Sequence, residues 1–197
     1  MHDTATIRPR MPNITPHVRK ALRPRGGTVE AGLPDGLWTV DPSESEIGFA
    51  VKGAWGLQTV RGVFRSYLGD LSVLNGDVDG HLSIEAASLD TGNVQRDRHL
   101  RSTDFFDVER YPRVVFSTAA VIAREGRLTV GGLLTVARSQ VELQVPVEVR
   151  HDGDGMVRLR GGASIPRDAA GMVWNKLGMI RGDVKLHAIL VLNPASS

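Results

Sequence analysis

The chain has no cysteine among its 197 residues. This absence excludes disulfide bonds, thiolate metal sites and cysteine nucleophiles together. Long hydrophobic runs are also absent: none approaches the roughly 20 apolar residues that a membrane-spanning helix needs. The basic N-terminus lacks the apolar segment of a secretory signal. For the sequence as given, these features predict a cytoplasmic protein.

The net charge of +2 is small, and it is unevenly distributed. Residues 1–36 contain six basic and three acidic residues, a balance of +3, which leaves −1 for the rest of the chain. A body without a positive field does not attract nucleic acid, so we expect no such partner.

The same N-terminal stretch holds five of the ten prolines and shows neither helical nor strand periodicity. We therefore interpret residues 1–36 as a disordered extension and residues 37–194 as one folded domain. The basic extension is either an arm that contacts a membrane surface or a solubilising leader.

Apolar and polar residues alternate along the folded domain. Two runs with one apolar face are Val141, Leu143, Val145, Val147 and Val149, and Val184, Leu186, Ala188, Leu190 and Leu192. Such alternation predicts strands with one buried and one solvent-facing side. Further strands are expected at residues 46–52, 59–68, 114–121, 128–136 and 156–165. About eight strands joined mostly by short turns predict an all-β fold, either a closed barrel or a sandwich.

One segment interrupts this pattern. Asn93 is placed to cap a short helix over residues 94–101, because its side chain can accept a backbone N–H bond from the first turn. That helix has few apolar residues, so we expect it to cross one end of the barrel. Phe105, Phe106 and Val108 then point inward as a plug.

Two segments resemble the YceI-like family. They comprise residues 38–42 (WTVDP), 45–52 (SEIGFAVK) and 59–64 (TVRGVF), followed by residues 89–93 (LDTGN), 96–102 (RDRHLRS), 104–109 (DFFDVE) and 111–112 (YP). The resemblance implies an antiparallel, lipocalin-like closed barrel of about eight strands with a short helical crossover and an elongated apolar cavity. It also implies a polyisoprenoid or another long-chain amphiphile as ligand, and a homodimer as one expected state.

Three departures from the family pattern affect the ligand more than the fold. Gly53 stands where the family usually has a histidine, residues 164–171 lose an Asn, an Asp and a Phe, and residues 136–140 replace a longer turn. All three fall on loops and strand ends, where barrel mouths are built.

The residues expected to line the cavity are apolar, because burying ligand carbons gives about 0.8 kcal/mol per CH₂. They are Phe49, Val51, Val60, Phe64, Phe105, Phe106, Phe116 and Trp174. The alternative is that these side chains fill a dry core without a cavity. Arg98, His99 and Arg101 are candidates for contacts with a ligand headgroup, and their alternative role is to tie the helix to neighbouring strands.

The sequence offers little support for catalysis. Its six histidines show no metal-ligand spacing, and it contains no nucleophile elbow, P-loop or dinucleotide motif. Asp104 and Asp107 are better explained as cap and turn residues than as an acid/base pair. We therefore expect no catalytic residue, no metal and no cofactor.

The expected function is thus lipid binding, as a carrier or reservoir. Two alternatives stay open: an enzyme or accessory factor that acts on an isoprenoid or fatty amide, and a packed barrel that serves protein association.

Overall fold

The computed structural model describes residues 33–53, 58–124, 127–166 and 181–195. In these ranges the strands are β1 (Gly36–Val40), β2 (Glu46–Gly53), β3 (Gln58–Phe64), β4 (Tyr67–Leu74), β5 (Asp77–Glu85), β6 (Leu89–Asp90), β7 (Arg113–Arg124), β8 (Arg127–Val136), β9 (Ser139–His151), β10 (Val157–Ile165) and β11 (Arg181–Pro194). The helical elements described are α2 (Val94–Arg101) and the 3-10 turns η2 (Ala86–Ser88) and η3 (Gly153–Gly155).

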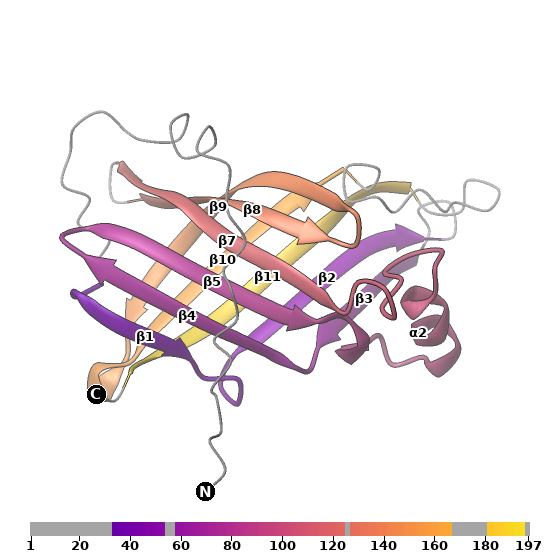
Figure 1. Cartoon of the computed structure of the whole chain (residues 1–197), viewed down its shortest axis with the longest axis horizontal. Helices are drawn as coiled ribbons and strands as arrows, with labels where there is room; N and C mark the ends of the chain where they lie inside the picture. The colour runs from indigo at the N-terminus through magenta and orange to yellow at the C-terminus, as the bar shows by residue number, and fades with distance from the viewer. Residues whose placement is uncertain (1–32, 54–57, 125–126, 167–180, 196–197) are drawn as a thin grey trace, which may run out of the picture.

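All these strands belong to one antiparallel sheet that closes on itself (Figure 1). Strand β1 pairs with β4 on one side and with β11 on the other, which closes an eight-stranded ring in the order β4-β5-β7-β8-β9-β10-β11-β1. Strands β2, β3 and β6 extend the sheet from the first part of β11. The closed antiparallel barrel with a short helical crossover, which the family resemblance implied, is confirmed.

The period-two pattern decides which side chains point into the barrel. On β10, Val157 and Ile165 are buried at 1% and 2% exposure, whereas Arg160 and Ser164 on the other face are exposed. Because each strand of the ring turns its apolar face inward, the barrel encloses a continuous apolar interior.

The two ends of the barrel have different covers. The β4–β5 and β9–β10 turns lie at one end, here called the hairpin end, where β7 also ends and β8 begins. Helix α2 lies at the other end, the α2 end (Figure 1). Near the hairpin end, Trp38 and Leu192 belong to a buried cluster against which Leu33 packs. At the α2 end, Phe105 and Phe106 are buried in the main core. Among described residues, both ends therefore carry buried apolar side chains.

One predicted strand is divided in the structure. The sequence predicted a single strand over residues 59–68, but β3 ends at Phe64 and β4 begins at Tyr67. Between them, the backbone N–H of Arg65 donates to Ser88 O, and the carbonyl oxygen of Ser66 accepts from the backbone N–H of Glu85. These bonds to the crossover segment turn the chain from one strand to the next, so the prediction of one strand was wrong.

A β-bulge bends β7 away from β5. Thr118 lies opposite Gly132 and Ala120 opposite Gly131, so Ala119 is an additional residue in β7. A bulged strand bends and loses pairing locally. Residues 81–85 of β5 pair with residues 113–117 of β7, and the ladder stops there. The two strands then separate toward the hairpin end (Figure 1).

The fold makes a direct prediction about core packing. Leu89 on β6 is fully buried at 0% exposure, whereas Leu68 on β4 is 69% exposed. We expect Leu89→Ala to lower the free energy of unfolding by about 2–5 kcal/mol, because it leaves a cavity in a packed core. Leu68→Ala should change it by less than about 0.5 kcal/mol. Urea unfolding of both variants measures the difference, and equal stabilities would contradict the described packing.

Candidate ligand cavity

A cavity of about 280 Å³ runs inside the barrel, and its wall is almost entirely apolar. It is lined by residues from both ends of the ring, from Leu71 and Leu159 toward the hairpin end to Phe105 and Phe106 at the α2 end. The volume lies near the lower limit of about 300–1,000 Å³ found for small-molecule pockets. The barrel is therefore not packed solid, which was the alternative left open by the sequence.

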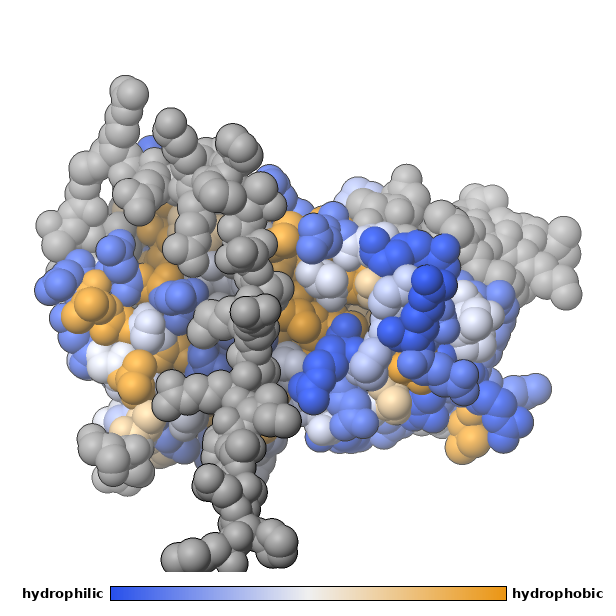
Figure 2. Space-filling view, viewed as in Figure 1, coloured by the Kyte–Doolittle hydropathy of each residue, from blue (hydrophilic) through white to orange (hydrophobic). Residues whose placement is uncertain are grey.

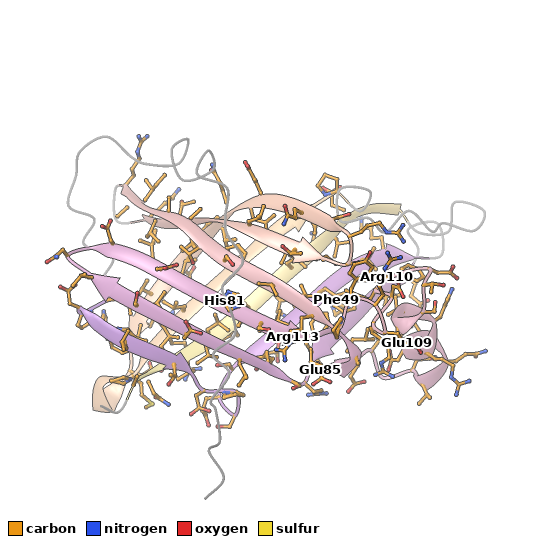
Figure 3. The ribbon with its side chains drawn as sticks, viewed as in Figure 1. Phe49, His81, Glu85, Glu109, Arg110 and Arg113 are labelled. Carbon is orange, nitrogen blue, oxygen red and sulfur yellow. The ribbon has the colours of Figure 1, made fainter. Side chains whose placement is uncertain are left out.

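Aromatic rings gather in the half of the cavity nearer α2. The ring centroids of Phe49 and Phe64 are 5.7 Å apart, and those of Phe64 and Phe106 are 6.0 Å apart in an edge-to-face arrangement. Phe49 lies on this side of the barrel in Figure 3. Such geometry adds to the stabilisation that burial of the rings provides.

Glycines on neighbouring strands make room for these rings. A Cβ atom on Gly62 would lie 2.6 Å from Cζ of Phe49, and one on Gly132 would lie 2.4 Å from Cζ of Phe116. Both distances are shorter than Cβ atoms in proteins show to other heavy atoms, so any larger residue at either glycine would displace the facing ring. The pairing of glycine with phenylalanine across strands fixes where the rings lie.

Six of the eight residues predicted for the cavity lie on its wall. These are Phe49, Val51, Phe64, Phe105, Phe106 and Phe116. Val60 is half-buried on the same face of β3 as Phe64, but it is not part of the wall. Trp174 lies outside the described residues. Their contact with a ligand stays a prediction.

The wall also contains many aliphatic residues that the sequence reasoning did not single out. Examples are Leu82, Leu134, Leu143, Leu186, Ala188 and Leu190. The alternation that predicted the strands also marked these positions. What the sequence could not indicate is which inward residues surround empty space and which are packed against one another.

Of the three predicted headgroup residues, Arg101 ties α2 to the segment that precedes it. Arg101 donates from Nε to Ala87 O at 2.8 Å and from Nη2 to Leu89 O at 2.6 Å. His99 Nε2 lies 3.1 Å from Oδ2 of Asp104, and Arg98 is exposed. The role of these residues in headgroup binding stays a prediction, and the contacts of Arg101 and His99 account for them structurally.

Other residues of the segment 90–97 also hold the start of α2 in place. Asn93 caps α2, because its side chain accepts the backbone N–H of Arg96 at 3.0 Å. Asp97, 7% exposed, accepts the backbone N–H and the hydroxyl of Thr91. The backbone N–H of Gly92 donates to Asp90 and lowers the pKa of that carboxyl group, with a smaller contribution from Arg65. These bonds fix the segment that connects β6 to α2.

Four polar residues reach the cavity, and their strand positions differ. Thr118 lies on the inward face of β7, whereas Asp70, His81 and His187 occupy outward positions on their strands. His187 packs its ring against Gly48, and its Nε2 lies 3.2 Å from Oε1 of Glu46. His81 lies about midway along the barrel (Figure 3), with Nδ1 3.3 Å from Oγ of Ser117.

Neither a metal site nor a membrane helix is found in the described part of the chain. No group of three or more His, Cys, Asp or Glu residues there is arranged to hold a metal ion. No helix there is long and apolar enough to cross a membrane.

Comparison with known proteins identifies the domain. The model of the YceI-like domain matches residues 38–192. The chain belongs to the YceI-like family. A UPF0312 protein of Vibrio parahaemolyticus is 29% identical over 129 residues, 60% of this chain and 68% of that protein. A UPF0312 protein of Staphylococcus aureus is 27% identical over 164 residues, 77% of this chain and 94% of that protein.

Solved structures of YceI-like barrels share the fold. BcnA of Burkholderia cenocepacia has a TM-score of 0.70 and 22% identity, and the match covers 77% of this chain and 98% of that one. A polyisoprenoid binding domain from Saccharophagus degradans has a TM-score of 0.66 and 13% identity, with coverage of 80% and 98%. At these identities the likeness concerns the fold of the YceI-like domain.

The contacts of Arg101 predict a structural effect. We expect Arg101→Ala to lower the free energy of unfolding by about 1–3 kcal/mol, because two backbone carbonyls lose a charged donor. Arg98→Ala should change it by less than about 0.5 kcal/mol. Urea unfolding tests both. If Arg101→Ala unfolds like the parent protein but no longer retains ligand, Arg101 acts on a headgroup instead.

Proposed function

We propose that this YceI-like domain binds a long-chain apolar ligand, such as a polyisoprenoid or a similar amphiphilic lipid, inside its barrel and serves as a carrier or reservoir. The observation that carries the proposal is the apolar cavity of about 280 Å³, which extends along the inside of the ring. Each ligand CH₂ that leaves water for such a cavity contributes about 0.8 kcal/mol. The polyisoprenoid binding domain from Saccharophagus degradans, which has the same fold, supports this ligand class.

The proposal is binding without catalysis. On the described strands, the inward positions along the cavity carry apolar side chains apart from the hydroxyl of Thr118. Acid/base chemistry needs an ionisable side chain within hydrogen-bond reach of the reacting atom. Asp70, His81 and His187 occupy outward strand positions, so none of them points into the interior, where the ligand chain would lie.

Three accompanying predictions rest on the sequence and the family resemblance. They are membrane contact through the basic residues of segment 1–36, a homodimer, and a cytoplasmic location. Removing residues 1–32 tests the first of these without touching the described contacts of Leu33 and Asp35.

The ligand itself can be identified by mass spectrometry of an organic extract. The protein is purified from its own cells beside a mock purification from cells that lack it. We expect a long-chain species in stoichiometric amount in the protein sample alone. An empty extract, together with no rise in melting temperature on adding polyprenols or polyprenyl phosphates, would contradict lipid binding.

Filling the cavity provides an independent test. Ala188 on β11 lines the cavity, whereas Ala50 on the neighbouring β2 points to the outer face. We expect Ala188→Phe to weaken ligand binding by about tenfold, because the ring displaces about two buried CH₂ groups of the chain. Ala50→Phe is the matched control and should leave affinity unchanged. Fluorescence titration with an apolar probe measures both, and equal affinities would place the ligand elsewhere.

A further inference from the structure

The wall of the barrel has a lateral split. Residues 77–80 of β5 and 119–124 of β7 belong to adjacent strands of the ring, but no ladder joins them. Residues 77–80 of β5 pair with β4 but not with β7. At about 3.3 Å per residue, this part of β5 is about 13 Å long. In Figure 1 the two ribbons lie side by side near α2 and separate toward the hairpin end.

The cavity extends to the start of this split. Gly80 and His81 on one bank and Thr118 on the other are all part of the cavity wall. Asp70 also belongs to the wall, although it is exposed on the outer face of β4. Figure 2 shows apolar residues at the surface in the middle of this face, beside the polar α2 end.

The ends of the barrel are less accessible in the described structure. Trp38, Val157 and Leu192 are buried toward the hairpin end at 5%, 1% and 2% exposure. At the α2 end, Phe105 and Phe106 are buried at 9% and 5%. A ligand that entered along the barrel axis would have to displace one of these clusters, whereas at the lateral split it would have to displace only the smaller cluster of Val121 and Leu128, against which Val78 packs.

Two hydrogen-bonding groups at the split have free capacity. The hydroxyl of Thr118 has no hydrogen-bond partner among the described residues. His81 uses Nδ1 toward Ser117, and its Nε2 has no partner in the described part of the chain. An imidazole and a hydroxyl beside an apolar cavity suit a ligand with an apolar chain and one polar head.

The charges around the split determine which ligand headgroup is favoured there. Asp70, Asp77 and Asp79 are exposed on the β4–β5 bank, and none takes part in an ion pair between described residues. On the other bank, residues 117–123 carry no charge, and Arg124 lies at the hairpin tip. A negative rim disfavours a phosphate or carboxylate head by like-charge repulsion.

We propose that the split between β5 and β7 is the mouth of the cavity, and that His81 and Thr118 hold the uncharged polar headgroup of a long-chain amphiphile there. The proposal rests on the proposed function of ligand binding in the barrel. It adds the point of entry, the headgroup site and a preference for neutral over anionic heads.

The point of ligand entry is tested by attaching a bulky label at one surface position at a time. Because the chain has no cysteine, single-cysteine variants can be labelled uniquely with a bulky maleimide. Ala120→Cys places the label at the mouth, Thr103→Cys at the α2 end and Glu148→Cys on the closed outer wall. We expect the label at residue 120 to slow uptake of geranylgeraniol by about tenfold and the other two labels to leave it unchanged. Slowing by the label at 103 and not at 120 would overturn the lateral mouth.

Headgroup preference is tested with two ligands that share a chain. We expect geranylgeraniol to bind more tightly than geranylgeranyl phosphate. His81→Leu should weaken geranylgeraniol binding about three- to tenfold, the loss of one hydrogen bond, and His81→Gln should restore part of it. His151→Leu on β9, which is exposed and not part of the cavity wall, is the matched control. Equal binding of geranylgeraniol by His81→Leu and the parent protein would remove His81 from the site.

The effect of the acidic residues beside the split on headgroup preference is tested with a double variant. Asp70→Asn with Asp79→Asn should raise affinity for geranylgeranyl phosphate about threefold, whereas Glu142→Gln on β9 should not. Tighter binding of the phosphate than of the alcohol by the parent protein would overturn the preference for neutral heads. If the parent protein binds neither ligand, the proposed function fails, whereas binding without these effects refutes only the mouth and the headgroup site.

Discussion

The pairing of one long strand with two partners determines much of this structure. Strand β11 pairs with β2 over its first part and with β1 over its last three residues. The pairing with β1 closes the ring. The pairing with β2 attaches the β2–β3 hairpin to β11 outside the ring. This hairpin leaves β3 at the edge of the sheet, and exposed edges invite pairing with other chains. Strand β6 pairs with β3 there, and Arg101 ties α2 to the carbonyls of the same segment. Leu89 and Asp90 of the central motif thus cover the end of this edge, at Val63 and Phe64.

The cavity depends on an unequal distribution of volume across the strands. Glycines at Gly62 and Gly132 admit the rings of Phe49 and Phe116 at distances that no Cβ would permit. A barrel interior of this size is filled when all inward residues are large. Here the rings gather toward α2, while Gly161, Gly162 and Ala163 line another part of the wall. Empty volume therefore results from where small residues lie, and an apolar ligand can recover the dispersion contacts that the wall lacks.

The sequence predicted what depends on local pattern. Alternation on β9 and β11 identified these strands and their inward faces, and Asn93 marked the start of α2. Of the six predicted cavity residues on the wall, Phe49, Val51, Phe64 and Phe116 lie at inward strand positions, whereas Phe105 and Phe106 follow α2. The break after Phe64 could not be predicted, because it is made by bonds to Ser88 and Glu85 from a distant part of the chain. The bulge at Ala119 was missed because an extra residue in one strand becomes visible only against its partner's register.

The bulge also shows why an opening in the wall costs less free energy than an opening at an end of the barrel. Opening a barrel at an end would expose the buried cluster of Trp38 or that of Phe106, which costs apolar burial. Separating two strands exposes backbone groups, and water satisfies these at little net cost when they lie at the surface. Ala119 confines the separation to the part of β7 beyond Thr118, while Val114 and the rest of the paired segment stay in the ladder. Because Val78 still packs near Val121 across the separated strands, the interior keeps apolar contacts beside the opening. A single additional residue thus gives access to the cavity without dismantling either end.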